Sequence, residues 1–333
     1  MKILTLGEIM LRLSSATGQR LSQTSSMSCH YGGGEANVAI SLANFGHDAY
    51  FASLVPDNLL GLGIKQHLQY YGVHTDYLLF GGERLGTYYL ETGVSQRGSQ
   101  VIYDRAYSSF SQISNDISQD ATLFTGIDLF HISGITPALS EDWQVLTKQL
   151  IQKARLAGCK ISLDINYRGK LWTQAAAGLV IRELLPLVDY CSAGELDARY
   201  ILALFDDKAI SVDLLTCYQK MVATYPNLAV IYSTKRQVRS ASENDLQGFI
   251  YRDGHLSMSQ AYHISPIIDR VGSGDAFSAG ILHGILKGWD AQEIITFGTA
   301  ACVLKHTIEG DRNLFTEREV LRFQKQVSGD IKR

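Results

Sequence analysis

The sequence predicts an α/β fold in which helices cover both faces of a mostly parallel sheet and a small β-sheet forms a lid. Two observations carry this prediction. Strand-like apolar segments alternate with helical segments along most of the 333 residues, a pattern typical of a parallel sheet. Two strand-rich stretches, at about 11–34 and 86–107, interrupt the alternation. We therefore expect one domain over residues 1–333, with these two stretches together forming the lid.

The first hundred residues begin the alternation and contain both interruptions. Apolar runs predict strands, and apolar positions at helical spacing before a glycine predict helices. The predicted strands are 2–6, 49–55, 87–90 and 100–103, and the predicted helices are 36–45 and 61–71. Residues 11–31 lose helical periodicity and are rich in Ser, Thr and Gln, which favours an excursion from the main body.

The alternation is regular from residue 128 onward. The predicted strands are 128–133, 160–164, 188–192 and 228–233, and the predicted helices are 140–157, 173–185, 195–204, 212–223 and 276–286. In sheets of this kind ligands bind beyond the carboxyl ends of the strands. Polar clusters follow three of the predicted strands, at 164–168, 192–195 and 233–235.

Composition favours a folded protein without nucleic acid or membrane as a partner. Hydrophobic residues make up 46% of the chain, the net charge is -3, and no basic run is present, whereas nucleic-acid binders usually present a basic face. No window approaches the roughly 18 consecutive apolar residues of a transmembrane helix, and the N-terminus resembles no cleavable leader. The five cysteines and nine histidines show no disulfide or metal-ligand spacing, so we expect a cytoplasmic protein and no direct metal ligand.

The segment IDRVGSGDAFSAG at 268–280 combines a glycine-rich turn with a carboxylate at a helix start. Gly272 and Gly274 flank Ser273, so several backbone N–H groups can converge on an anion. The small and apolar residues that follow predict a buried helix whose N-terminal end favours the same anion. Asp275 then occupies the predicted N-cap, where it either satisfies free N–H groups or accepts the proton of a substrate hydroxyl.

Two arginines are candidates for binding an anionic substrate. Arg105 follows a strand that carries Tyr103 in the expected lid, and Arg168 follows another strand in a loop that also carries Asn166. Guanidinium groups bind carboxylates through paired hydrogen bonds, although an average arginine is a solvated surface residue. Tyr88 and Tyr103 either hydrogen-bond substrate hydroxyls or only pack.

Two other positions leave two interpretations open, and a third has one. The glycine run at 32–34 precedes a helix and permits either close approach of a ligand or a hinge. Glu195 begins a predicted helix, where it either orients Mg²⁺ through water or complements the helix dipole. Asp311 follows Gly310, and from the residues alone it is a turn residue.

Motifs at opposite ends of the chain resemble the two signatures of the ribokinase family of sugar kinases. These are GGGEANVAISLANFG at 32–46 and DRVGSGDAFSAG at 269–280. Further segments resemble the subgroup that phosphorylates 2-keto-3-deoxygluconate: GEIMLRLS at 7–14, YDR at 103–105, ITPALS at 135–140, LDINYRGKLW at 163–172 and ACVLKHTIEGDRN at 301–313. The resemblance covers nearly the whole chain. It implies a ribokinase-like fold, Mg²⁺-dependent transfer of the γ-phosphoryl group of ATP to the 6-hydroxyl of that sugar acid, and homodimers or higher homo-oligomers formed through the lid.

The resemblance also implies roles for individual residues. Asp275 matches the general base, and Gly272, Ser273 and Gly274 match the anion hole. Positions that contact the substrate are matched by Gly33, Tyr88, Tyr103, Arg105, Ile135, Arg168 and Asp311. Positions that contact nucleotide or Mg²⁺ are matched by Asn166, Ser192, Glu195, Ser233, Thr234 and Thr299.

Two other functions stay open at this point. A neutral-sugar kinase, such as a fructokinase, would not depend on Arg105, whereas a sugar-acid kinase would. A catalytically silent sensor of sugars or nucleotides would keep the same fold, and the intact Gly-x-Gly-Asp sequence at 272–275 argues against it. Among sugar acids, the choice between the gluconate compound and its galactonate epimer rests on one hydroxyl, and both stay open.

Overall fold

The computed structural model describes residues 1–112, 116–205 and 212–325, and its largest element is a ten-stranded sheet. The strand order is β13-β12-β11-β10-β9-β8-β1-β4-β5, with β14 paired to β12. Neighbouring strands are parallel from β5 to β11, and β12 pairs antiparallel with β11, β13 and β14. The predicted, mostly parallel sheet is therefore confirmed. Its strands are β1 (Lys2–Leu6), β4 (Asp48–Val55), β5 (Leu78–Phe80), β8 (Leu129–Ser133), β9 (Lys160–Asp164), β10 (Tyr190–Ser192), β11 (Val230–Ser240), β12 (Glu243–Arg252), β13 (His255–Met258) and β14 (Tyr262–Ile264).

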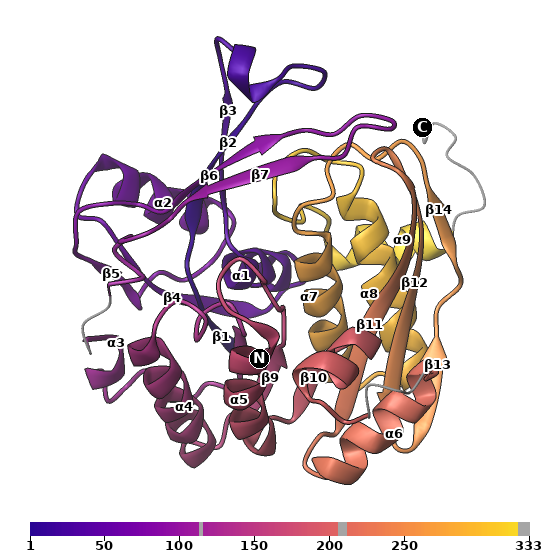
Figure 1. The fold of residues 1–333 in the computed structure, drawn as a ribbon. Helices are drawn as coiled ribbons and strands as arrows, with labels where there is room; N and C mark the ends of the chain where they lie inside the picture. Colours follow the sequence, from indigo (N-terminus) through magenta and orange to yellow (C-terminus); the bar gives the residue numbers. More distant parts are fainter. Residues whose placement is uncertain (113–115, 206–211, 326–333) are drawn as a thin grey trace.

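Helices cover both faces of this sheet (Figure 1). Alternate side chains of β1 point to opposite faces of the sheet. Leu4 and Leu6 pack in one apolar cluster, and Ile3 packs in another. The first cluster includes side chains of α4 (Glu141–Leu156), α5 (Gln174–Leu184) and α6 (Leu214–Thr224). The second includes side chains of α1 (Gly34–Asn44), α2 (Leu59–Tyr70), α7 (Ser273–Leu286), α8 (Ala291–Lys305) and α9 (Glu317–Gln324). Short helical segments are η1 (Leu21–Gln23), α3 (Asp116–Gln119), η2 (Leu185–Leu187) and the π-helical η3 (Asp197–Ile201).

A separate sheet of four strands, in the order β3-β2-β6-β7, lies outside the main sheet. The strands are β2 (Met10–Ser14), β3 (Ser28–Gly32), β6 (Thr87–Glu91) and β7 (Gln100–Asp104). The two inner strands are parallel to each other, and each outer strand is antiparallel to its neighbour. Figure 1 shows these strands projecting from the main body on the side of α1. The small sheet predicted from residues 11–34 and 86–107 is confirmed, and we call it the lid.

The far edge of the main sheet differs from the prediction. The sequence predicts a strand that ends at Ser233, whereas β11 continues to Ser240 because it pairs along its length with β12. Asp253 and Gly254 join β12 to β13, and both have positive φ angles, 52° and 81°. Asp-Gly is a frequent sequence for such two-residue hairpin turns, so the signal for this hairpin was available. The elements β5, β12, β13, β14, α8 and α9 were not predicted.

Candidate active site

Helix α7 begins at the glycine-rich segment, with Gly272 as its N-cap. Gly272 has a φ of 78°, a left-handed conformation that glycine adopts without strain. A Cβ atom at this position would overlap the carbonyl oxygen of Asp311, so the close approach of the two backbones also requires glycine. Asp275 is the third residue of the helix. Its predicted N-cap position is therefore wrong, because the backbone turn at Gly272 begins the helix three residues earlier.

The first turn of α7 leaves backbone N–H groups available to an anion. Within the described ranges, the N–H groups of Gly274 and Asp275 have no protein acceptor, whereas the N–H of Ser273 donates to the Arg270 carbonyl at 3.3 Å. A Cβ atom at Gly274 would meet nothing within 4 Å, so the space beside this turn is open. Free N–H groups at the positive end of a helix suit phosphate oxygens.

The carboxylate of Asp275 is held by helix α1. Nδ2 of Asn37 donates a hydrogen bond to Oδ2 of Asp275 at 2.7 Å. A Cβ atom at Gly34 would lie 3.7 Å from Oδ1 of Asp275 and 3.8 Å from Nδ2 of Asn166, so these two predicted residues flank the start of α1. Asn37 was not predicted, although a polar residue inside an apolar helix was the available signal.

Burial gives two carboxyl groups of the site unusual acidities. Burial raises the pKa of Asp275 to about 7, while the hydrogen bond from Asn37 and the charge of Arg168 lower it and the charge of Glu35 raises it further. Burial also raises the pKa of Asp164, at the end of β9, to about 7, and the charge of Asp275 adds to that increase. A carboxylate with a pKa near 7 is suited to accept a proton at neutral pH.

Arg12, which was not predicted as a site residue, joins the lid to the segments beside the glycine-rich loop. It extends from β2 and forms ion pairs with Asp269 at 2.6 Å and with Asp311 at 2.5 Å. The hydroxyl of Tyr88, from β6, also donates to Asp311. All four side chains are buried. Asp311 lies in the bend after α8, as expected for a turn residue. It also belongs to a buried network of charged side chains that no sequence pattern predicted.

Arg105 follows β7, and its guanidinium group pairs with the buried carboxylate of Glu8. The hydroxyl of Ser108 also donates to Glu8, at 2.5 Å. Nε of Arg105 is buried and has no partner among the described residues, so this side chain keeps a free donor. Tyr103 lies with its ring centroid 6.0 Å from Cζ of Arg105 and is 41% exposed, whereas Tyr88 is buried.

The other predicted substrate residues lie in segments that follow strands of the main sheet or the lid. Arg168 is exposed in the loop after β9, 3.5 Å from the Tyr167 carbonyl oxygen, and its charge lowers the pKa of Asp275. Ile135 is half-buried in the turn after β8. Gly33 is the N-cap of α1, and a Cβ atom there would overlap a backbone carbonyl oxygen. Gly33 therefore permits close packing of the chain on itself at a helix start, and the approach of a ligand to the glycine run stays a prediction.

Ser192 is the last residue of β10, and Ser233 follows Tyr232, the last residue of β11 that pairs with β10. The hydroxyl of Ser233 accepts a hydrogen bond from Tyr218 at 2.7 Å. Glu195 follows β10, with its side chain 39% exposed and 3.5 Å from the guanidinium group of Arg199. The end of β10 and the adjoining part of β11 thus carry hydroxyl and carboxylate groups.

Comparison with known proteins identifies the family. The profile of the pfkB family carbohydrate kinases matches residues 1–316. The chain belongs to the pfkB family of carbohydrate kinases. It is 32% identical to a 2-dehydro-3-deoxygalactonokinase of Haloferax volcanii, over 96% of each chain.

Two solved structures resemble this kinase over nearly their full length. The 2-dehydro-3-deoxygluconokinase of Thermotoga maritima has a TM-score of 0.94 and 37% identity, covering 98% of this chain and 100% of that chain. A PfkB family carbohydrate kinase of Listeria grayi has a TM-score of 0.93 and 43% identity, with the same coverage. The ribokinase-like fold is confirmed, and the protein is a sugar-acid kinase related to 2-dehydro-3-deoxygluconokinase.

Two predicted nucleotide residues of this kinase meet at one position of β12. Thr234 lies opposite Gly248 in the β11–β12 pair, and the hydroxyl of Thr299 packs so close to Gly248 that a Cβ atom there would overlap it. Thr299 is fully buried and donates to the Ile295 carbonyl in its own helix at 2.8 Å. The structure therefore encloses the Thr299 hydroxyl and does not bring it to the open part of the site.

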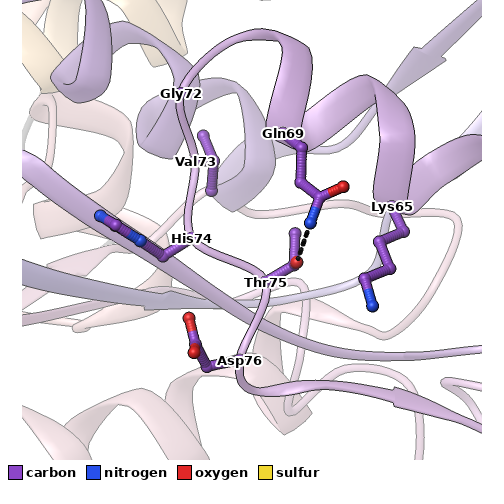
Figure 2. Close-up of a pocket in the computed structure, with 7 residues that line it drawn as sticks. All are labelled: Lys65, Gln69, Gly72, Val73, His74, Thr75 and Asp76. Carbon is purple, nitrogen blue, oxygen red and sulfur yellow. Dashed lines mark hydrogen bonds between the residues drawn. The ribbon is translucent and has the colours of Figure 1, made fainter.

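One surface hollow lies away from the predicted site residues. The hollow lies beside α2 and has a volume of about 490 Å³. Figure 2 shows its lining residues, none of which is a predicted site residue. Its lining residues are Lys65, Gln69, Gly72, Val73, His74, Thr75 and Asp76. Over the described ranges, no group of three His, Cys, Asp or Glu side chains is arranged to hold a metal ion. Within the same ranges, no helix is long and apolar enough to cross a membrane.

Proposed function

We propose that this kinase transfers the γ-phosphoryl group of ATP to the 6-hydroxyl of 2-keto-3-deoxygluconate, as one domain over residues 1–333 with the lid over its active site. One observation carries the proposal. The carboxylate of Asp275, with a pKa near 7, is fixed by Asn37 in the first turn of a helix whose N–H groups are free. This arrangement puts a proton acceptor beside an anion-binding turn.

The proposed chemistry needs few groups. The 6-hydroxyl oxygen attacks the γ-phosphorus, its proton passes to Asp275, and the bond from the γ-phosphorus to the bridging oxygen breaks to release ADP. The N–H groups of Gly274 and Asp275 would stabilise charge on the phosphoryl oxygens in the 272–274 loop. Phosphoryl transfer depends mainly on positioning and electrostatics, so this small set suffices.

The sugar acid would bind between the lid and the strand ends. Arg105 and Arg168 would hold its carboxylate, because Arg105 keeps a free buried donor and Arg168 is exposed in the loop after β9. The remaining contacts would come from Gly33, Tyr88, Tyr103, Ile135 and Asp311. Asp311 already binds Arg12 and Tyr88. It would therefore position the Tyr88 ring as well as contact the substrate.

ATP would lie beyond the end of β10 and along the part of β11 that extends past it. At this edge Ser192, Ser233, Thr234 and Asn166 would contact the nucleotide, and Thr299 would support it from behind β12. Glu195 is a carboxylate near this edge with its side chain partly exposed, which fits Mg²⁺ held through water. The ion supplies charge neutralisation for the phosphoryl group in transfer.

The proposal extends to location and assembly. The described cysteines are free, and four of the five are buried, which suits a reducing cytoplasm.

We propose that two copies associate through the lid, as a homodimer or a larger homo-oligomer. Analytical ultracentrifugation of the whole chain tests this, and a single monomeric species at micromolar concentration would contradict it.

A second substrate has one observation in its favour. The Haloferax volcanii relative, whose name gives the galactonate epimer as substrate, matches over 96% of each chain. The epimers differ at one hydroxyl, so the same carboxylate contacts would serve both. A fructokinase activity has no comparable support, because its substrate lacks the carboxylate that Arg105 and Arg168 would bind.

A coupled assay of ADP release tests the proposal with the purified chain, ATP and MgCl₂. The substrates are 2-keto-3-deoxygluconate, its galactonate epimer, gluconate and fructose. We expect the highest kcat/KM with one of the two keto acids, at least about 10-fold above fructose, from the charged hydrogen bonds that fructose cannot form. Fructose as the best substrate would replace the proposal with a neutral-sugar kinase. ADP release with none of them would favour a silent sensor.

A further inference from the structure

Lys305, the last residue of α8, is a buried cation that the proposed chemistry does not use. Its side chain is fully buried. A lysine in the last turn of a helix often complements the helix dipole, but such residues usually remain in water. Lys305 instead points away from its own helix toward the segment before α7.

The ammonium group of Lys305 is bound by backbone carbonyls. Nζ lies 3.2 Å from the carbonyl oxygen of Asp269 and 3.4 Å from that of Ile308. Among the described residues it forms no direct ion pair with a carboxylate. The same segment is tied to the end of α8 a second time, because the N–H groups of Ile268 and Asp269 donate to the carbonyl of His306.

The surrounding charges explain how a buried lysine is tolerated there. Burial lowers the pKa of Lys305, whereas the charges of Asp269 and Asp311 raise it and the charge of Arg12 lowers it. Two cations, Arg12 and Lys305, and two carboxylates, Asp269 and Asp311, thus form one buried group with no net charge. A buried ammonium group is tolerated when backbone carbonyls accept its hydrogen bonds and carboxylates of opposite charge lie nearby.

This buried group of charges lies next to the loop that leads into α7. Asp269 is three residues before Gly272, and its Oδ1 accepts the N–H of Val271 at 3.0 Å. Its carbonyl is bound by Lys305. Both contacts constrain the chain immediately before the free N–H groups of Gly274 and Asp275.

We propose that Lys305 is a positioning residue for phosphoryl transfer, an internal ammonium ion that binds the Asp269 carbonyl and keeps the 269–274 loop in the conformation that receives the phosphoryl group. This inference rests on the proposed kinase function. Lys305 touches neither substrate in this arrangement. It acts through the loop backbone, so its loss should lower kcat more than it changes KM for the sugar acid.

The test removes the ammonium group and then returns it from solution. Lys305→Ala should lower kcat by about 10- to 100-fold, the scale of a charge-assisted hydrogen bond, with KM for the sugar acid within about twofold. Ammonium or methylammonium chloride should restore part of the lost kcat in a saturable way. Tetramethylammonium chloride at the same ionic strength should not, because it is too large for the space left by one side chain. The control is Lys287→Ala, which removes an exposed lysine that pairs with Glu317 and should keep wild-type kcat.

Hydrogen exchange gives a readout that does not need kinase activity. Without substrates, the hydrogen-bonded amides of Val271 and Ser273, within residues 270–275, should exchange faster in Lys305→Ala than in the wild type. Those of 279–286 in α7 should stay unchanged, and ammonium should reverse the difference. If Lys305→Ala does not fold, Lys305→Gln provides the same comparison. A kcat within about twofold of wild type, equal rescue by tetramethylammonium, or unchanged exchange at 270–275 would each overturn the proposal. A wild-type chain without kinase activity overturns the proposed function, whereas the exchange result still decides whether Lys305 holds the loop.

Discussion

Asn37 donates a hydrogen bond from its side-chain amide to the carboxylate of Asp275 at 2.7 Å, across the junction of α1 and α7. The two residues come from opposite ends of the chain, and their contact fixes the group to which we assign proton transfer. The contact also lowers the pKa of Asp275 against the increase caused by burial. The two residues therefore give the most direct tests of the site.

Asp275→Asn should lower kcat by about 10² to 10⁴, the usual scale for a positioned acid–base group. KM for the sugar acid should change little, because the amide keeps the size of the carboxylate and its oxygen can still accept the hydrogen bond from Asn37. Steady-state kinetics with the coupled assay measure both constants. A variant that folds and keeps near-normal turnover would show that Asp275 is not the proton acceptor.

The same substitution should stabilise the folded protein at alkaline pH. Burial raises the pKa of Asp275 from an ordinary 3.8 to about 7, so the folded state binds this proton more tightly than the unfolded state. Ionised Asp275 therefore destabilises the folded protein. This loss of stability is absent below pH 4, grows between pH 4 and 7, and is complete above pH 7. At pH 8, Asp275→Asn should raise the free energy of unfolding by about 1 to 4 kcal/mol. Urea unfolding at pH 4.5 and 8 measures it, and a gain that does not increase with pH would contradict the burial argument.

The acid limb of the pH–rate profile should follow the pKa of Asp275. The kcat/KM of the wild type should fall about 10-fold per pH unit below pH 7, because the protonated carboxyl cannot accept the hydroxyl proton. Asn37→Ala removes a hydrogen bond that favours the charged carboxylate, so it should move this limb to higher pH. Asn44→Ala, at the far end of α1, is the matched control and should leave the limb in place. If the acid limb lies at the same pH in all three proteins, the group that titrates is not Asp275.

Arg105→Ala should raise KM for the keto acid by about 10- to 100-fold, from the loss of charged hydrogen bonds. The variant also leaves the buried carboxylate of Glu8 without its cation. The double variant Glu8→Gln, Arg105→Ala separates the two effects, because it removes the unpaired charge as well. Recovery of the wild-type KM in the double variant would mean that Arg105 serves Glu8 rather than the substrate.

Arg12→Met should lower the free energy of unfolding by about 3 to 5 kcal/mol, because it leaves two buried carboxylates with one cation fewer. Arg84→Met breaks an exposed pair with Asp104, where the expected loss is below about 1 kcal/mol. Urea unfolding of both variants provides the comparison. Similar losses in the two proteins would show that the Arg12 network contributes no more than a surface pair.

Local patterns predicted most of the fold and the α7 part of the site. Apolar runs bounded by glycine identified β1 and β9 at their observed ends, and the two breaks in the alternation identified the lid. The glycine-rich turn, the helix after it and Asp275 are close in sequence, so one segment contained the whole signal. The N-cap was misplaced because sequence favours Asp there, whereas the left-handed turn at Gly272 depends on the nearby Asp311 backbone.

Contacts between distant segments were beyond local patterns. In β2, Arg12 lies on the buried face while the two leucines of the strand are only half-buried, the reverse of the usual alternation. The partners Asp269 and Asp311 are each more than two hundred residues away, and no spacing connects them to Arg12. The β11–β12 pair likewise extends β11 past the polar residues that marked its predicted end.

The Arg12–Asp311 ion pair spans 299 residues of sequence, which has a consequence for synthesis on the ribosome. A nascent chain that stops before Asp311 can build most of the sheet, yet Arg12 and Asp269 then have one charged partner fewer and the turn at Gly272 lacks its neighbour. Contacts of such high sequence separation form late. The candidate active site should therefore be among the last parts to mature, so translation stalled near the end of the message would yield a compact but inactive species.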